Sequence, residues 1–306
     1  MKRLSVVVPL YNEQGSLAEL HRRIVEACDG VIDDYEVIYI DDGSTDGSGS
    51  VLADLRSNDT RVRIITFRVN SGKAAGLQAG FDAATGDYII TMDADLQDDP
   101  AEIPALVAEL DSGLDMVSGW KKTRHDPLSK RLPSKLFNAV VRFISGMKLH
   151  DFNCGLKAYR REVVDTLNIY GELHRYIPVL AKFEGFRVGE IAVRHHPRKF
   201  GRSKYGVKRF LSGFLDLLTV ILLTRYTMKP LHLFGSIGLI LCLLGGIVNF
   251  YIVTLWLRYH NIQGRQPLLV GGVFLFLLGM QFISTGLLAE LITHSRMEKR
   301  RPFREE

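Results

Sequence analysis

The sequence predicts an α/β fold with a mostly parallel sheet, followed by two helices that are long enough to cross a membrane. Up to residue 119, short apolar runs alternate with segments of helical length, which is typical of parallel strands joined by crossover helices. Residues 231–257 and 268–292 are almost uninterrupted apolar runs. Each run exceeds the ~20 residues that a helix needs to span a bilayer.

Strands and helices follow from these patterns in chain order. Strands are expected at residues 4–10, 35–40, 62–67, 88–92, 115–119 and 188–193. Ser16 and Glu19 form a capping-box pattern that opens a helix running to about residue 28, and Asp46 is placed to cap the next helix, which runs to about residue 56. Further helices are expected over 72–84, over 134–145 and from Pro100, because proline is tolerated in a first turn.

Composition changes sharply after residue 206 and predicts three regions. Residues 1–206 would form the α/β domain, and 230–306 would hold the two membrane spans and a basic tail. Between them, over 207–229, one helical face carries Phe210, Phe214, Leu218 and Ile221, which indicates a helix lying in the membrane interface. The alternative is a core helix of the first domain. Glycines in both spans permit close helix packing within one chain or in a homo-oligomer.

Basic residues predict the orientation in the membrane. They gather before the first span and after the second, whereas the loop between the spans has only Arg258 and Arg265. The positive-inside rule therefore places both termini in the cytoplasm. The net charge of +5 fits contact with an anionic leaflet, and nucleic-acid binding ranks low because the charge lies beside the spans. The three cysteines show no spacing typical of a metal site or a disulfide.

Two carboxylates, Asp93 and Asp95, follow the apolar run 88–92. Open α/β sheets bind ligands at the carboxyl ends of their strands, and Mg²⁺ is held in proteins by carboxylates together with substrate phosphates. We therefore expect a metal and diphosphate site here. An acidic turn exposed to solvent is the alternative, and the neighbouring motifs favour the metal site.

Polar residues also follow the first two strands. Tyr11 offers a face on which a base can stack, Glu13 can accept ribose hydroxyls, and Asp41 or Asp42 can accept the ring N–H of a pyrimidine. No Gly-x-Gly-x-x-Gly follows the first strand, so hydride transfer with a dinucleotide is disfavoured. Residues 70–76 open a helix with small residues and Lys73, which favours anions, although an ordinary loop before a packed helix is the alternative.

Together these motifs resemble family 2 glycosyltransferases of the GT-A fold. The matching segments are Val-Val-Pro-Leu-Tyr-Asn-Glu (7–13), Asp-Asp-Gly-Ser-Thr-Asp (41–46), Asn-x-Gly-Lys (70–73) and Met-Asp-Ala-Asp-Leu-Gln-Asp-Asp-Pro (92–100). Residues 151–157 and 201–205 resemble the polyprenyl-phosphate branch, which includes dolichol-phosphate mannose synthase and the bacterial bactoprenol glucosyltransferases. The match spans about residues 4–206.

The resemblance implies roles for the matching positions. Asp93 would hold ribose or metal, and Asp95 and Gln97 would ligate Mg²⁺ or Mn²⁺. Asp151 is the candidate general base, or else it orients Lys157 or an arginine. The nucleotide-sugar pocket would be lined by Pro9, Tyr11, Glu13, Asp41, Asp42, Lys73, Asp93 and Ala94. The acceptor and its phosphate would be held by Arg131, Ser134, Lys157, Arg198, Ser203 and Lys204. For the basic residues outside the core, attraction of anionic lipid is the alternative.

The predicted activity is inverting transfer of a hexose from a nucleotide-sugar to polyprenyl phosphate, at the cytoplasmic face of a bacterial inner membrane. The resemblance suggests UDP-glucose, with UDP-N-acetylglucosamine, UDP-galactose, GDP-mannose or a modified arabinose donor left open. A processive polysaccharide synthase should have more spans and a Gln-x-x-Arg-Trp motif, which Trp120 and Trp256 do not form. A non-catalytic membrane scaffold would have no need for the acidic and phosphate-binding motifs.

Overall fold

The computed structural model describes residues 3–32, 34–122, 138–143, 145–197, 230–262 and 264–297. The chain divides into two compact units, residues 1–217 and residues 218–306. The predicted interface helix at 207–229 lies outside the described residues, so its placement stays a prediction.

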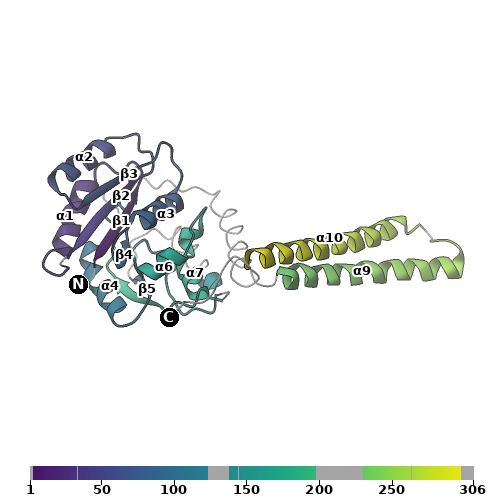
Figure 1. Cartoon of the computed structure of the whole chain (residues 1–306). Helices are drawn as coiled ribbons and strands as arrows, with labels where there is room; N and C mark the ends of the chain where they lie inside the picture. Colours follow the sequence, from purple (N-terminus) through teal and green to yellow (C-terminus); the bar gives the residue numbers. More distant parts are fainter. Residues whose placement is uncertain are drawn as a thin grey trace. The chain divides into compact units, whose positions relative to one another are not determined.

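A seven-stranded sheet forms the centre of the first unit (Figure 1). Its strand order is β3-β2-β1-β4-β6-β5-β7. β6 runs antiparallel to its neighbours β4 and β5, whereas every other pairing is parallel. The strands are β1 (Leu4–Leu10), β2 (Tyr35–Asp41), β3 (Val62–Thr66), β4 (Tyr88–Thr91), β5 (Met116–Lys121), β6 (Lys157–Arg160) and β7 (Val188–Val193). The predicted mostly parallel α/β sheet is confirmed, and β6 is the strand that the apolar pattern did not reveal.

Helices cover both faces of this sheet (Figure 1). On one face lie α1 (Leu17–Cys28), α2 (Ser48–Asn58), the short helix η1 (Pro100–Glu102) and α4 (Ile103–Asp111). On the other lie α3 (Lys73–Ala83), α6 (Arg161–Thr166), η2 (Leu173–Arg175) and α7 (Ile177–Phe183). The predicted capping box at α1 was wrong in detail, because the Ser16 hydroxyl donates to the Glu13 carbonyl (2.9 Å) instead of capping the helix.

Alternating residues of β1 determine what each helix layer contacts. Leu4, Val6 and Val8 belong to the core that also contains apolar residues of α1 and α4. Val7 points to the opposite face, where α3 packs so closely that a Cβ on Gly80 would lie 2.3 Å from Val7 Cγ1. The close packing at Gly80 fixes α3 against β1, and the N-terminus of α3 consequently lies near the carboxyl ends of the strands.

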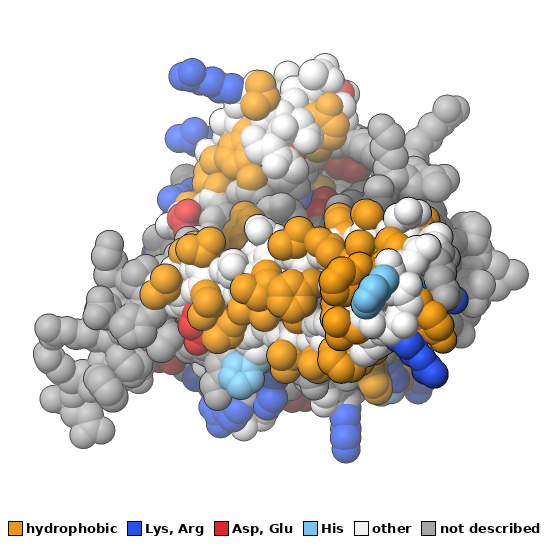
Figure 2. Space-filling model, turned by 90° about the vertical axis from the view of Figure 1, so that its right-hand side faces the viewer, with side chains coloured by type: hydrophobic (Ala, Val, Ile, Leu, Met, Phe, Trp, Pro, Cys, Tyr) orange, Lys and Arg blue, Asp and Glu red, His pale blue; other side chains and the backbone are white. Residues whose placement is uncertain are grey.

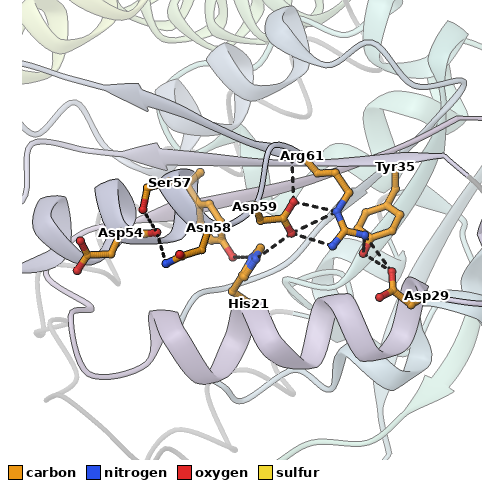
Figure 3. Close-up of polar contacts among 9 residues, drawn as sticks. His21, Asp29, Tyr35, Asp54, Ser57, Asn58, Asp59 and Arg61 are labelled. Carbon is orange, nitrogen blue, oxygen red and sulfur yellow. Dashed lines mark hydrogen bonds and ion pairs between the residues drawn. The ribbon is translucent and has the colours of Figure 1, made fainter.

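A polar cluster joins α1 to the amino ends of β2 and β3 (Figure 3). Arg61 pairs with Asp59 (2.8 Å) and Asp29 (2.9 Å), and Tyr35 donates to Asp29 (2.6 Å). The imidazole of His21 lies 3.3 Å from Asp59, and burial lowers the pKa of His21 although Asp59 opposes the shift. This network holds the first residues of β2 and β3 in place. It lies at the amino ends of these strands, whereas the polar motifs follow the carboxyl ends of the strands.

The second unit is an antiparallel pair of helices, α9 (Pro230–Tyr259) and α10 (Gln266–Met297). Both are long and apolar enough to span a bilayer, as predicted. A Cβ on Gly238 would lie 2.6 Å from the Gly279 carbonyl oxygen, and one on Gly245 would lie 2.7 Å from that of Gly272, so the glycines permit close backbone approach within the hairpin. Apolar side chains cover most of the hairpin surface facing the viewer in Figure 2.

Candidate active site

The topology gathers the polar motifs at one edge of the sheet. β1 lies between β2 and β4, so the strand order reverses beside β1, and ligands of open α/β sheets bind in the crevice at such a point. β4 ends at Thr91, just before Asp93, and its antiparallel partner β6 begins at Lys157, opposite Thr91. The antiparallel strand therefore brings residues 151–157 to the edge that holds Asp93 and Asp95.

The Asp-x-Asp turn has an unusual backbone. Leu96, between Asp95 and Gln97, has φ +60°, a left-handed conformation that costs energy for a residue with a large side chain. Its side chain is buried in the core, which holds the turn in place. Asp95 is also buried, and its Oδ1 accepts the Gln97 amide N–H (3.1 Å). Core packing thus fixes the two candidate metal ligands relative to each other.

Asp93 forms an ion pair with Lys73 at the start of α3. Burial alone would raise the pKa of Asp93, but the cations of Lys73, Lys121 and Lys157 lower that pKa to about 2. Asp93 is therefore ionised at neutral pH. A Cβ on Gly155 would lie 2.6 Å from Asp93 Oδ2 and 2.8 Å from Asp98 Oδ2, so the absence of a side chain at Gly155 makes room for two carboxylates.

Two residues beside the turn were missed by sequence reasoning. His195, after β7, forms a β-bridge with Asp98, and its Nε2 lies 3.4 Å from Gln97 Nε2. Lys121, at the end of β5, lies 2.8 Å from Asp98. Burial lowers the pKa of Lys121, but Asp98, Cys154 and Asp93 together raise that pKa above its ordinary value. Only the parallel pairing of β5 with β7 brings these residues together, and no motif at 121 or 195 signals it.

The candidate nucleotide residues lie on two adjoining loops. Ser44 accepts the Asn12 N–H (2.9 Å), and Asn12 Oδ1 accepts the Thr45 N–H (2.8 Å). Asp41 accepts the Ser44 N–H (2.9 Å). Of the other predicted members, Pro9 at the end of β1 and Tyr11 and Glu13 on the first loop are half-buried, and Ala94, between Asp93 and Asp95, is buried. The loops after β1 and β2 therefore form one continuous wall beside the turn.

Asp42 has a structural task that the sequence did not reveal. Its two carboxylate oxygens accept the N–H groups of Ser71 (2.6 Å) and Gly72 (2.9 Å). Gly72 has φ +88°, which favours glycine at this position, directly before α3. Asp42 thus holds the loop that positions Lys73, and contact with a pyrimidine is not needed to explain its presence.

Asp151 and Lys157 lie inside the protein. Asp151 is 1% exposed and its Oδ1 accepts the Asn153 N–H (3.1 Å), which makes a tight turn. The Lys157 ammonium donates to the Cys154 carbonyl and is 4% exposed. Burial lowers the pKa of Lys157, and the charges of Asp151 and Asp93 offset part of that shift. Lys157 is therefore a buried cation close to both carboxylates.

A small hollow with about 10 Å³ of enclosed space lies beside Asp93. It is lined by Lys73, Lys157, Asn153, Gly155 and His174, among others. His174, on η2, was not predicted to be functional. The remaining predicted acceptor residues lie outside the described ranges; they are Arg131, Ser134, Arg198, Ser203 and Lys204.

Comparison with known proteins assigns this arrangement to a family. The sequence profile described as Glycosyl transferase family 2 matches residues 5–167. The chain belongs to glycosyltransferase family 2. It is 41% identical to the dodecaprenyl-phosphate galacturonate synthase of Rhizobium johnstonii (strain DSM 114642 / LMG 32736 / 3841). The alignment extends over 300 residues and covers 95% of this chain and 88% of that protein.

Solved structures confirm the GT-A fold of this family 2 chain. Glucosyl-3-phosphoglycerate synthase of Mycobacterium tuberculosis, in complex with Mn²⁺, UDP-glucose and phosphoglyceric acid, aligns with a TM-score of 0.53 at 21% identity, over 72% of this chain and 79% of that one. The same enzyme with Mn²⁺, UDP and phosphoglyceric acid aligns with a TM-score of 0.55 at 19% identity, over 72% of this chain and 78% of that one. At these identities the likeness shows the fold alone.

Proposed function

We propose that this family 2 glycosyltransferase transfers a sugar from a nucleotide-sugar to a polyprenyl phosphate, giving a polyprenyl-phosphate sugar. The observation that carries the proposal is the gathering of Asp95, the Asp93–Lys73 pair and Lys157 at one edge of the sheet. Two helices of membrane-spanning length and a 41% identical relative named for a polyprenyl-phosphate product support the lipid acceptor.

The donor side of the site fits a divalent cation. Asp95 and Gln97 supply the oxygen ligands that Mg²⁺ and Mn²⁺ prefer, and His195 adds a nitrogen next to Gln97. Within the described ranges no three His, Cys, Asp or Glu side chains form a ready-made metal site. An ion held by Asp95 and Gln97 would take its remaining ligands from a substrate diphosphate. When bound, the ion neutralises charge on the leaving nucleoside diphosphate.

The chain's own residues position the donor. Asp42 holds the loop before α3, so the N–H groups at the start of that helix face the edge of the sheet together with Lys73. Both features attract a diphosphate. We propose that Lys73 exchanges its contact with Asp93 for a donor phosphate, which frees Asp93 for ribose or metal. Tyr11, Glu13 and Asp41 form the wall on which a nucleoside would lie.

The acceptor needs no strong base. A phosphate monoester has a second pKa of about 6 and is mostly dianionic at neutral pH, so its oxygen is already a nucleophile. Direct attack on the anomeric carbon would invert that centre. Since Asp151 is buried against its own turn and near Lys157, we propose that it positions residues 153–157.

We expect Asp151→Asn to lower kcat by about 10-fold, less than the 10²–10⁴-fold typical of a lost general base. The acidic limb of the pH–rate profile should remain, because the acceptor phosphate sets it. The measurement is single-turnover transfer between about pH 5 and 9, with Asp165→Asn, at an exposed position on α6, as the matched control. A larger loss together with disappearance of the acidic limb would instead identify Asp151 as the base.

The reaction itself is tested with purified full-length protein, undecaprenyl phosphate, Mn²⁺ and a panel of nucleotide-sugars. We expect the sugar to enter a lipid product only when both lipid and metal are present, and EDTA to stop it. The family resemblance suggests UDP-glucose as donor, and the name of the Rhizobium relative suggests a galacturonate donor. A water-soluble polymer as product would indicate a polysaccharide synthase, and no product from any donor would favour a scaffold.

The same proposal includes a place in the membrane. The two apolar helices would anchor the enzyme, and the basic residues around them favour a cytoplasmic catalytic unit and cytoplasmic termini. Nucleotide-sugars would then reach the site from the cytoplasm, while the polyprenyl chain stays in the lipid.

A further inference from the structure

Asn138 is a buried polar residue on the short helix that precedes the Asp151 turn. Its side chain belongs to a residue that is only 6% exposed. The Nδ2 group donates to the His150 carbonyl (3.0 Å), and Oδ1 accepts the Phe152 N–H in a longer contact (3.5 Å). One side-chain amide therefore holds the backbone on both sides of Asp151.

The backbone around Asp151 needs such partners. Residues 146–156 lie outside helices and strands, so their buried N–H and C=O groups depend on side chains or water. The orientation of the Asn138 amide follows from its two partners, because a carbonyl can only accept and an N–H can only donate. An alanine at this position would leave both backbone groups without the partners that asparagine supplies.

Other contacts hold the same segment to the protein. Arg142, on the same helix as Asn138, donates from Nε to the Leu149 carbonyl (3.2 Å). The side chain of Phe152 is fully buried, and Leu149 is buried as well. The segment should therefore stay packed when the Asn138 amide is removed. What the amide adds is the exact placement of the backbone that carries Asp151.

The Asp151 turn leads directly into the candidate site. Asp151 accepts the Asn153 N–H (3.1 Å), and Asn153 and Gly155 line the hollow beside Asp93. The Gly155 carbonyl accepts the hydroxyl of Thr91 (3.0 Å), at the end of β4. Because a Cβ on Gly155 would lie only 2.6 Å from Asp93 Oδ2, a small displacement of this backbone would reach Asp93.

The helix that carries Asn138 belongs to the acceptor side of the proposed function. The predicted acceptor residues Arg131 and Ser134 precede it in the sequence. Between Asp126 and Asp151 the sequence has no Asp or Glu, and it has five cationic residues, which are Lys130, Arg131, Lys135, Arg142 and Lys148. Such a segment suits contact with a phosphate. Asn138 thus connects a segment of acceptor character to the turn beside Asp93.

We propose that Asn138 is a positioning residue for glycosyl transfer. It fixes residues 150–152 to the helix on the acceptor side, and through residues 153–155 it keeps the acceptor phosphate and Asp93 in register. The inference rests on the proposed function and adds a residue that acts through the backbone of its neighbours, without touching substrate.

Asn138→Ala should lower kcat by about 10-fold, because a loosened turn places the reacting groups less accurately. KM for the nucleotide-sugar should change by less than about 2-fold, because uniform binding of the nucleoside depends on the loops after β1 and β2. Steady-state transfer to undecaprenyl phosphate with Mn²⁺ measures both. The matched control is Asn58→Ala on α2, where the amide donates to the Asp54 carbonyl (2.8 Å) at an exposed position, and it should keep the wild-type kcat.

A double variant separates positioning from a general loss of stability. Asn138→Ala and Asp151→Asn loosen the same turn, so together they should lower kcat by about 10-fold, as each does alone. Two independent effects would instead multiply to about 100-fold. A loss of that larger size, or a folded Asn138→Ala protein with wild-type kcat, would overturn the inference.

Asn138→Asp is the second variant, because it has the same shape and leaves no cavity. It keeps an acceptor for the Phe152 N–H but, when ionised, has no N–H for the His150 carbonyl, so it should also lose kcat. If neither variant folds, Asn138 serves the fold alone and the inference is wrong. If the wild-type chain makes no lipid product from any donor, it is the proposed function that fails, and the inference with it.

Discussion

Replacing Asp95 by asparagine should reduce glycosyl transfer by about 10²- to 10³-fold, the range found when one preorganised electrostatic contact is lost from a transition state. Asparagine keeps the shape and the acceptor for the Gln97 N–H but removes the negative charge. The loss should appear in kcat at saturating donor, together with a higher Mn²⁺ concentration for half-maximal activity. Initial rates at varied Mn²⁺ measure both quantities.

The control for Asp95→Asn is Asp54→Asn, the same chemical change at an exposed position on α2. It should leave both rate and metal dependence unchanged. Thermal unfolding of the Asp95 variant should remain cooperative, because the core around Leu96 is unaltered. Wild-type activity in a folded Asp95→Asn protein would rule out the metal assignment.

Replacing Gly155 by alanine should lower activity by about 10²-fold, the loss expected from a displacement of about 1 Å at a reacting centre. The new Cβ would lie 2.6 Å from Asp93 Oδ2 and 2.8 Å from Asp98 Oδ2, so at least one carboxylate must move. Displacing Asp93 also disturbs its pair with Lys73. Steady-state kinetics with varied donor would measure the effect.

Gly49→Ala is the control for Gly155→Ala. Gly49 lies in α2 with nothing within 4 Å of an added Cβ, so this change should leave transfer intact and slightly stabilise the helix. A Gly155→Ala enzyme as active as the wild type would show that the positions of Asp93 and Asp98 are not critical.

The parallel part of the fold was predictable because its strands are buried on both faces. Residues 35–41 are buried throughout, and the apolar run Val-Ile-Tyr-Ile at 37–40 within them is typical of a buried strand. β6 was not recognised because its four residues, Lys-Ala-Tyr-Arg, carry charge at both ends. Its strand character depends on pairing with β4 and β5, which are distant in sequence. Local pattern does not encode such pairing.

The residues of the candidate site likewise fall into two groups: those that the local sequence reveals and those that depend on contacts distant in sequence. Asp93 and Asp95 were predictable because they directly follow a strand, and strand ends of a parallel sheet share an edge. Lys157 was selected through family resemblance alone, as a phosphate ligand. His174 and His195 carry no motif and reach the site through η2 and through the segment after β7. The task of Asp42 in holding residues 71–72 likewise depends on a contact between loops.

The most direct test of the central claim is a crystal structure of the full-length protein with UDP and Mn²⁺. The claim is that Asp95 and Gln97 hold a cation against a nucleotide diphosphate at the carboxyl edge of the sheet. We predict anomalous density for manganese bonded to Asp95, with the diphosphate oxygens completing its coordination and Lys73 turned from Asp93 toward a phosphate. Manganese and UDP bound elsewhere, with Asp93 still paired to Lys73 and Asp95 free of metal, would contradict it.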